Sequence, residues 1–236
     1  RVQSRNYHIM GLPENGSFAQ YLLVSEDRLI QCPEHLSNEE AAALPLAGLT
    51  AYRALFTRAQ CRPKERVLIS GFGGGVASTA FLFARAINCE LYVSSSSAEK
   101  RELAMKMGAK AAFDYREKGF GKKIYKDHGG VDVVIDGAAG EGFGELVEAC
   151  RPAGRISVYG GTAGKAMMSP QKLFWKQLNI LGSTMGSDKD FQEMVGFVEQ
   201  HKISPLVSSV HSLSDGKVAF EAMDRQEQTG KIVLIP

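Results

Sequence analysis

The stretch "VLISGFGGGVASTAFLFARA", from Val67 to Ala86, decides the fold. It begins as a β-rich apolar run, passes through a cluster of glycines, and continues with the apolar spacing of a helix. Gly71, Gly74 and Ala77 stand in a G-x-x-G-x-x-A pattern. Glycine permits positive φ and close approach of a ligand to the backbone, and a small alanine lets the helix lie near the strand. The stretch predicts a strand, a phosphate-binding turn and a helix.

A glycine turn of this kind also has a simpler interpretation, a tight connection with no ligand, because a lone fingerprint is weak evidence. The context favours dinucleotide binding, since the turn follows the first strand of a βαβ unit and opens a helix whose N-terminus attracts phosphate. A P-loop is excluded because no Gly-Lys-Ser/Thr follows. We expect Gly71, Gly74, Gly75 and Val76 to lie along a pyrophosphate.

Strand and helix patterns alternate on both sides of this turn, from residue 65 to residue 184. The expected strands are 66–70, 90–94, 111–115, 131–136, 155–159 and 179–183, and the expected helices are 76–87, 99–107, 142–150 and 170–177. Apolar strands such as "VDVVID" are typical of a parallel sheet covered on both faces. The predicted fold class is therefore α/β, with a doubly wound parallel sheet of the Rossmann type.

The two ends of the chain have a different pattern. The first contains "GSFAQYLLV" (16–24) and a helix start at which Ser37 and Glu40 form a capping box. After Gly186 we expect one amphipathic helix at 188–201 and then short β-like pieces. We expect these ends to pack together as parts of a second domain.

Bulk composition excludes several classes of function. The chain has 236 residues, of which 44% are hydrophobic and 23% charged, which is typical of a globular protein. Its net charge of +2 is too small to indicate a nucleic-acid or membrane partner. No apolar run approaches the ~20 residues that span a bilayer. Cys32, Cys61, Cys89 and Cys150 lie far apart without zinc-ligand spacing, so we expect free thiols and a cytoplasmic location.

The segment after the second expected strand bears on the choice between NAD and NADP. NAD-specific sheets usually carry a carboxylate there for the ribose 2′-OH. Here the segment is "YVSSSSAEKRELA" (92–104), with Ser95 at the strand end and Lys100 beyond it. Hydroxyls and a cation suit a 2′-phosphate, although a polar loop and a solvated lysine would look the same. We favour NADPH as the cofactor.

Six segments in order resemble the medium-chain dehydrogenase/reductase superfamily, and most closely its zinc-independent, quinone-oxidoreductase-like branch. They are "GSFAQYLLV", "AAALPLAGLTAYRAL", "VLISGFGGGVASTA", "AEKRELAMKMGAKAAFDY", "VDVVIDGAAG" and "GKIVLIP". The resemblance covers nearly the whole chain. It implies a GroES-like barrel domain split by a Rossmann domain, with limits at 1–50, 51–184 and 185–236. It also implies that most of the barrel precedes Arg1.

The resemblance implies that no catalytic zinc is bound. Zinc-dependent members place a cysteine ligand where this chain has Leu46, which cannot coordinate a metal. The plain structural interpretation of this residue is a leucine of the core. Two further ligands of such members would lie upstream of this chain, so a zinc-type alcohol dehydrogenase is kept as an alternative.

Positions toward the cofactor follow from the same resemblance. Thr50 matches a residue near the nicotinamide, although a buried hydroxyl bonded to backbone is the alternative. Lys100 and Tyr115 match residues that contact the adenosine 2′-phosphate, while Tyr115 could instead pack on the sheet. Asp136 ends a buried strand and is as consistent with capping a loop as with contacting a cofactor.

The remaining matched positions lie on the nicotinamide side. Gly160 and Gly161 match backbone beside the nicotinamide ribose, and Ser183 to Met185 line the same cleft. Arg225 lies near an arginine used for phosphate in some relatives, but its spacing to "GKIVLIP" differs.

The expected activity is hydride transfer from NADPH to a quinone or an α,β-unsaturated carbonyl, with no identified catalytic acid. A non-catalytic NADP-binding protein is the second alternative. A methyltransferase is more remote, because the acidic residue expected at the end of its second strand is missing. Relatives dimerise through the last strand of the sheet, here "LNILGST" (178–184), so we expect a homodimer.

Overall fold

The computed structural model describes residues 8–236 and has a six-stranded parallel sheet with the order β3-β2-β1-β4-β5-β6. The strands are β1 (Arg66–Ile69), β2 (Glu90–Ser94), β3 (Ala111–Phe113), β4 (Val131–Asp136), β5 (Cys150–Val158) and β6 (Asn179–Gly182). β1 pairs with β2 on one side and β4 on the other, so Val67 lies opposite both Leu91 and Val133. From β1 the chain continues outward through β2 and β3 on one side, and then returns to add β4, β5 and β6 on the other side. Sheets of this kind bind ligands at the point between β1 and β4 where the strand order reverses. The predicted doubly wound sheet is confirmed.

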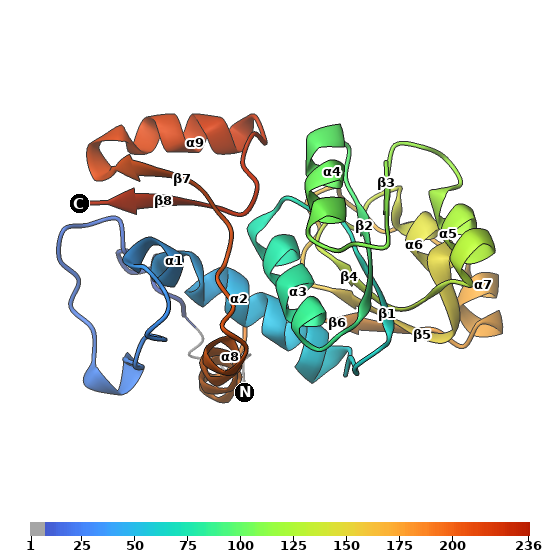
Figure 1. The fold of residues 1–236 in the computed structure, drawn as a ribbon, viewed down its shortest axis with the longest axis horizontal. Helices are drawn as coiled ribbons and strands as arrows, with labels where there is room; N and C mark the ends of the chain where they lie inside the picture. The colour runs from blue at the N-terminus through green and yellow to red at the C-terminus, as the bar shows by residue number, and fades with distance from the viewer. Residues whose placement is uncertain (1–7) are drawn as a thin grey trace.

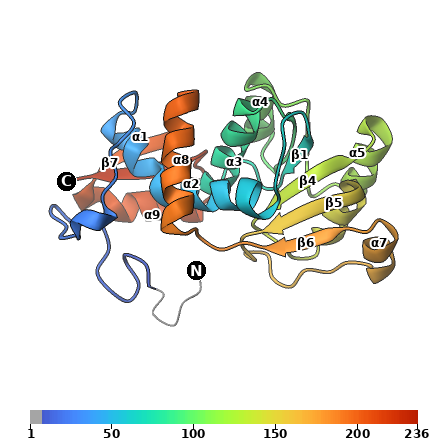
Figure 2. The same cartoon turned by 90° about the horizontal axis from the view of Figure 1, so that it is seen from below.

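Helices cover both faces of the sheet, as Figures 1 and 2 show. Successive residues of β1 point to opposite faces: Val67 and Ile69 belong to the same buried cluster as Phe81, whereas Leu68 packs with Ile124. The first cluster lies under α2 (Pro45–Tyr52), α3 (Gly75–Ala86), α4 (Ala98–Lys106) and α8 (Asp188–His201), and the second under α5 (Phe120–His128) and α6 (Phe143–Ala149). Burial on both faces explains why these strands are continuously apolar.

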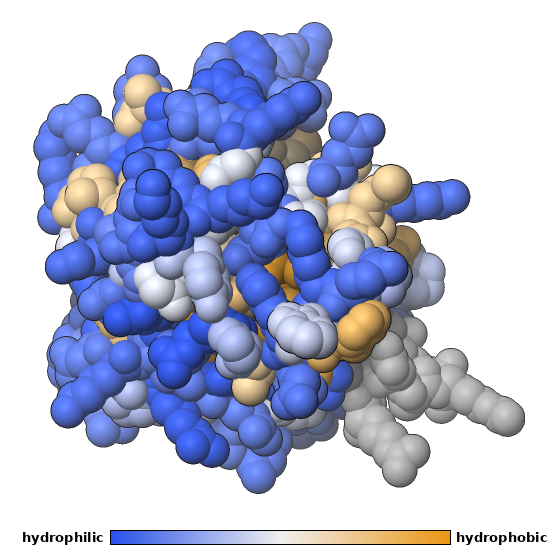
Figure 3. Space-filling view, turned by 90° about the vertical axis from the view of Figure 1, so that its right-hand side faces the viewer, coloured by the Kyte–Doolittle hydropathy of each residue, from blue (hydrophilic) through white to orange (hydrophobic). Residues whose placement is uncertain are grey.

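The end of the molecule that carries α5 and α7 (Pro170–Trp175) presents mainly hydrophilic side chains around a small apolar recess (Figure 3). None of the helices in the described part of the chain is both long and apolar enough to span a membrane.

The two ends of the chain meet in a second lobe (Figure 1). β7 (Val207–Ser212) and β8 (Lys231–Ile235) form a parallel pair, and α1 (Asn38–Ala43) packs against both. Phe18 contacts Phe220 edge to face at a centroid distance of 5.9 Å. The lobe also holds α9 (Gly216–Asp224) and the 3-10 turns η1 (Glu26–Arg28) and η3 (Leu213–Asp215). The π-helix η2 (Arg53–Arg58) follows α2 and packs on the six-stranded sheet instead. The expected packing of the ends is confirmed; the domain limits and the barrel stay predictions.

The sequence pattern missed two helices. α5 was not expected because its segment "FGKKIYKDH" is rich in charge, although Phe120 and Ile124 stand one turn apart and are both buried. Gly119 and Gly129 are the N-cap and C-cap of this helix, and the backbone of both has the positive φ of the left-handed region. α9 lies where only β-like pieces were expected, and it buries only Ala219.

Several predicted limits also change. β1 ends one residue early, β3 and β6 end before residues 115 and 183, and β5 begins at Cys150 rather than Arg155. The capping box is confirmed: the Glu40 N–H donates to Ser37 Oγ at 3.2 Å, and the Ser37 N–H donates to Glu40 Oε2 at 2.9 Å.

Candidate functional site

The glycine turn between β1 and α3 has the backbone that only glycine adopts easily. Gly71 has φ of 68° and Gly73 has φ of 122°. A Cβ atom on Gly71 would meet nothing within 4 Å, so space is open above this residue. Gly74 is the N-cap of α3 and supplies no side chain to bond the first turn. The N–H groups around Gly75 and Val76 are therefore free to meet an anion.

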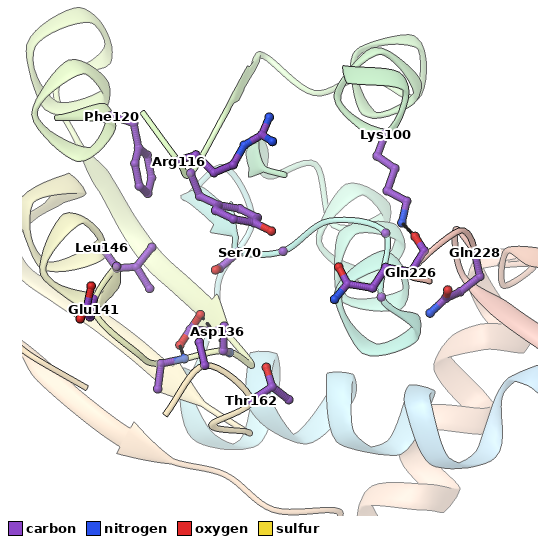
Figure 4. A pocket seen from close by; sticks show the side chains of 18 residues that line it. Ser70, Lys100, Arg116, Phe120, Asp136, Glu141, Leu146, Thr162, Gln226 and Gln228 are labelled. Carbon is purple, nitrogen blue, oxygen red and sulfur yellow. Dashed lines mark hydrogen bonds between the residues drawn. The ribbon is translucent and has the colours of Figure 1, made fainter. Parts of the chain in front are cut away.

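A cleft of about 790 Å³ opens over this turn, at the carboxyl ends of β1 and β4 (Figure 4). Its walls come from the glycine turn, from the loops after β3, β4 and β5, and from the segment between α9 and β8. They include Ser70, Gly71, Gly73, Gly74, Lys100, Tyr115, Arg116, Phe120, Asp136, Ala138, Ala139, Thr162, Gln226 and Gln228. This place between reversing strands is the ligand site of doubly wound sheets.

A smaller pocket of about 370 Å³ adjoins the glycine turn beside α4. It brings together Ser95, Lys100 and Tyr115, which were predicted for the 2′-phosphate, with Gly71, Arg116 and Arg225. Ser95, Lys100, Tyr115 and Arg116 come from segments that follow β2 or β3 or begin α4 at the same edge of the sheet, whereas Arg225 is the C-cap of α9. Hydroxyls and cations thus converge beside the glycine turn.

Local hydrogen bonds hold this pocket in shape. Ser97 is the N-cap of α4, and its Oγ accepts from the Lys100 N–H at 3.2 Å. The Tyr115 hydroxyl donates to Ser96 Oγ at 2.9 Å, and Arg116 Nη2 donates to the Ser96 carbonyl at 2.7 Å. The serine run is therefore not a plain polar loop: it caps α4 and positions two side chains of the pocket.

Charge in the pocket is only partly neutralised. Asp114 pairs with Arg116 at 2.5 Å and with Arg101 at 3.2 Å, and the bonds from Arg116 hold the pKa of Asp114 well below its usual range. Lys100 Nζ donates to the backbone carbonyl of Gln226 at 2.7 Å (Figure 4). In the part of the chain that is described, no carboxylate pairs with Lys100. Partial burial lowers the pKa of Lys100, which is the response expected of a cation without a counter-charge.

The residues predicted for the nicotinamide side lie apart from these two pockets. Thr50 Oγ1 lies 3.9 Å from Met185 Sδ, so its hydroxyl is not bonded to backbone. Met185 has a positive φ of 42°, a strained value for a side chain of this size. Ser183 Oγ is buried and has no hydrogen-bond partner in the described part of the chain. Ser183 and Met185 follow β6, whereas Thr50 lies in α2 and contacts Met185. None of the three lines either pocket.

Gly160 and Gly161 differ in their surroundings. A Cβ atom on Gly160 would lie 2.6 Å from the carbonyl oxygen of Gly137, whereas one on Gly161 would meet nothing within 4 Å. Close packing of the loops after β4 and β5 therefore requires glycine at position 160. Neither glycine lines the two pockets, although their neighbour Thr162 lines the larger one.

Asp136 caps the loop after β4, one of its two predicted roles. Its carboxylate accepts from the N–H groups of Ala138 and Ala139, at 3.4 Å and 2.8 Å. Ala139 has a positive φ of 55° and lines the cleft. The carboxylate thus shapes a cleft wall through backbone groups.

Two structural interpretations from the sequence are wrong. Leu46 is 53% exposed and is not a core residue, because α2 turns this position away from the sheet. Tyr115 does not pack on the sheet: β3 ends at Phe113, and the tyrosine side chain is 44% exposed. Sequence reasoning also missed Arg116. Its place directly after Tyr115, beyond the third strand, was the signal that could have found it.

No group of three or more histidine, cysteine, aspartate or glutamate side chains among residues 8–236 is arranged to hold a metal ion.

Comparison with known proteins shows which family the chain resembles. The zinc-binding dehydrogenase family profile matches residues 75–200. The zinc-type alcohol dehydrogenase-like protein YogA of Leptosphaeria maculans is 37% identical over 232 residues, covering 93% of this chain and 64% of that protein. The chain thus spans a little under two thirds of this relative.

Two solved structures are similar over nearly the whole chain. An NAD-dependent alcohol dehydrogenase superposes with a TM-score of 0.92 at 30% identity, covering 98% of this chain and 68% of that one. The quinone oxidoreductase of Thermus thermophilus, whose structure was solved alone and with NADPH, superposes with a TM-score of 0.83 at 31% identity. The match covers 95% of this chain and 75% of that one. The chain therefore belongs to the zinc-binding dehydrogenase family, within the medium-chain dehydrogenase/reductase superfamily of oxidoreductases.

Proposed function

We propose that this chain is the cofactor-binding part of an NADPH-dependent reductase that transfers hydride to a quinone or an α,β-unsaturated carbonyl without a catalytic zinc. The observation that carries the proposal is the pocket beside the glycine turn, where Ser95, Lys100, Tyr115 and Arg116 converge. A 2′-phosphate supplies the dianion that Lys100 lacks, whereas a free 2′-hydroxyl would leave this cation without a counter-charge. The similar quinone oxidoreductase that was solved with NADPH supports the same choice.

The residues present fit a bound dinucleotide. Gly71, Gly74, Gly75 and Val76 would hold the pyrophosphate at the N-terminus of α3, where Gly74 leaves the first turn uncapped. The 2′-phosphate would replace the Gln226 carbonyl as the partner of Lys100.

The nicotinamide end is assigned to the residues between the two lobes. Ser183 Oγ, buried without a partner, provides an unused hydroxyl there, and the strained backbone of Met185 holds its side chain against Thr50. We therefore propose Thr50, Gly160, Gly161, Ser183 and Met185 for that end.

When bound, the nicotinamide supplies the hydride, so the chain needs no nucleophile of its own. Its residues position the cofactor: the glycine turn holds the phosphates, and the loops after β4 and β5 form a wall beside it. Leu46, at the place of a zinc-ligand cysteine in zinc-dependent relatives, carries the proposal that the oxygen of the substrate is not polarised by a metal. Metal analysis of the purified protein tests this; stoichiometric zinc would favour the alcohol dehydrogenase alternative.

We further propose that the protein is a homodimer joined through β6. This strand pairs with β5 alone in the described sheet, so its other edge is open. Phe174 and Trp175, just before it, are 65% and 84% exposed. An open edge beside apolar side chains is typical of an interface. Sedimentation at micromolar concentration is expected to show a dimer, and a monomer would contradict this proposal.

We also propose a cytoplasmic location, because all four cysteines are free. Cell fractionation tests this, and recovery of the protein in a secreted or membrane fraction would contradict it.

A paired titration with NADPH and NADH, followed by the fluorescence of Trp175 and the tyrosines, tests the cofactor. Tighter binding of NADPH is expected, and turnover of quinones and enones is then measured. Equal or tighter binding of NADH would overturn the cofactor choice. Binding of NADPH without turnover of any carbonyl compound would favour the non-catalytic alternative.

A further inference from the structure

Two cysteines from different segments are in contact at the amino end of the sheet, away from the cleft. Cys61 follows η2, Cys89 precedes β2, and they are separated by 28 positions in the chain. Their Sγ atoms lie 3.7 Å apart. Cys61 is buried, Cys89 is partly buried, and residues 62–64 beside them are exposed. The fold thus joins thiols that are scattered in the sequence and gives small solutes access to one of them.

The two thiols share one hydrogen-bonding environment. Cys89 Sγ donates to the carbonyl of Arg62 at 3.4 Å, and Cys61 Sγ lies 3.9 Å from the same oxygen. The contact with Cys61 lowers the pKa of Cys89, and the contact with Cys89 raises the pKa of Cys61. A hydrogen bond from the Cys61 thiol therefore favours the thiolate at Cys89 once Cys89 loses the proton that it donates to the Arg62 carbonyl. Burial of Cys89, and then the nearby carboxylates of Glu65 and Asp132, oppose this lowering of its pKa but do not reverse the direction.

We propose that Cys61 and Cys89 are a modification site, which a hydroperoxide oxidises to a reversible intrachain disulfide. The sulfurs must approach from 3.7 Å to about 2 Å, which the exposed turn at residues 62–64 allows by a small movement. Neither cysteine lines the cleft or the smaller pocket, so the proposal is independent of the proposed function.

The reaction balances with hydrogen peroxide as the oxidant. The Cys89 thiolate attacks one peroxide oxygen, the O–O bond breaks, and Cys89 becomes a sulfenic acid while hydroxide leaves. The Cys61 thiol then gives up its proton and its sulfur attacks Cys89 Sγ. The S–S bond forms, the S–O bond breaks, and the second oxygen leaves as water. Two thiols lose two electrons and the peroxide is reduced to two waters.

The other two cysteines are natural controls. Cys32 is exposed and its Sγ contacts only the carbonyl of Pro33, so it has no neighbouring thiol among the described residues. Cys150 is buried, and burial raises its pKa to about 12, so it is a poor nucleophile.

The test treats the full chain with hydrogen peroxide and maps its peptides by mass spectrometry without reduction. We expect one linked pair, Cys61 to Cys89, within a single chain, and its loss on treatment with dithiothreitol. Cys32→Ser and Cys150→Ser should retain the link, whereas Cys61→Ser and Cys89→Ser should lack it. Because the wild-type map alone is decisive, a poorly folded variant does not affect the test.

Three results would overturn the proposal: no link in the wild type, a link that involves Cys32, or conversion of Cys89 to a sulfinic acid while Cys61 stays reduced. NADPH binding is measured on the oxidised and reduced protein, and we expect it to be equal. A failure of NADPH binding in both forms would count against the proposed function and would leave the disulfide result unaffected.

Discussion

At the amino ends of the parallel strands, charged side chains pair with one another, whereas at the carboxyl ends Lys100 has no carboxylate partner among the described residues, although Arg101 and Arg116 pair with Asp114. Arg155 contacts Glu65 at 2.6 Å, and Arg151 contacts Asp132 at 3.2 Å. At the other edge, the one partner of Lys100 among residues 8–236 is a backbone carbonyl. The two edges belong to the same sheet, but they differ in whether their charged side chains have partners of opposite charge.

The difference teaches how one sheet separates stability from binding. Paired charges at the amino edge hold adjacent strands and loops together and have little left to offer a ligand. At the carboxyl edge, glycines replace side chains and leave N–H groups and a cation exposed to an anion. Four predictions test or refine this comparison.

The largest effect is expected from Gly160→Ala at the carboxyl edge. Its Cβ atom would lie 2.6 Å from the carbonyl oxygen of Gly137, and two backbone loops must then separate. We expect the free energy of unfolding to fall by about 2–3 kcal/mol. Urea denaturation measures it, with Gly161→Ala as the matched control, because its Cβ atom meets nothing within 4 Å. Equal stability of the two variants would contradict the close packing.

The second prediction concerns Asp190, a buried carboxylate whose oxygens accept hydrogen bonds from neighbouring side chains. In this it resembles Glu65 and Asp132 at the amino edge, which also have charged partners. Burial alone would raise its pKa, but bonds from Thr57, Ser187 and Arg53 outweigh burial and hold the pKa at about 2. Because the pKa of Asp190 is lower in the folded than in the unfolded chain, its ionised form stabilises the fold at pH values above the unfolded pKa, near 4. This stabilisation is lost as the pH falls toward the folded pKa of about 2. We expect a loss of about 2 kcal/mol across that range.

Denaturation measured at a series of pH values between 5 and 2 gives the slope. Asp190→Asn should flatten the profile in this range, and the exposed Asp188→Asn should leave it unchanged. A wild-type profile as flat as that of Asp190→Asn would show that the bonds to Asp190 do not favour its ionised form.

The third prediction removes the available cation of the carboxyl edge and rests on the proposed function. Lys100→Met keeps a side chain beside Gly73 and removes the ammonium group. We expect NADPH affinity to fall about 10- to 30-fold, the loss of one charge-assisted contact, with NADH affinity unchanged. Lys106→Met on the same helix is the control, because Lys106 is exposed and pairs with Glu102. Equal losses for both cofactors would place Lys100 outside the 2′-phosphate site.

The smallest effect is expected from Arg155→Met at the amino edge. Arg155 also donates to the carbonyl of Ala59 at 2.8 Å, and it is partly exposed, so solvent screens the ion pair. We expect a loss of about 1 kcal/mol in unfolding free energy, no change in NADPH affinity, and a rise in the pKa of Glu65. Arg151→Met, at a more exposed pair, should change stability less. A drop in NADPH affinity would contradict the separation of the two edges.

Local pattern predicted most of the sheet. The central strands β1, β2 and β4 were expected because each is a short, largely apolar run buried on both faces. The glycine turn was expected because its backbone angles disfavour other residues. The missed helices show the limit of this reasoning. α5 and α9 have nine residues each and bury few side chains, so each offers only a few apolar positions to a sequence pattern, although these fall on one face of the helix.

Only some of the residues that line the site could be predicted from the sequence. Ser95, Lys100 and Tyr115 follow from their places after the second and third strands, and the structure brings them into one pocket. Arg116 and Gln226 also line this pocket but were not predicted from the sequence. Gln226 lies more than a hundred positions after Lys100, whose ammonium group it binds through its carbonyl. Leu46 was expected in the core and is exposed, because the helix that carries it packs through its other side.

Residue order along the chain was enough for the βαβ pattern and the phosphate turn, since both depend on neighbours within a few positions. Folding was needed to bring Cys61 to Cys89, Lys100 to Gln226, and Arg53 to Asp190. Each of these contacts joins segments whose distance is set by the order of strands and the packing of helices. That order arises from the burial of apolar surface over the whole domain, which no local stretch of sequence encodes.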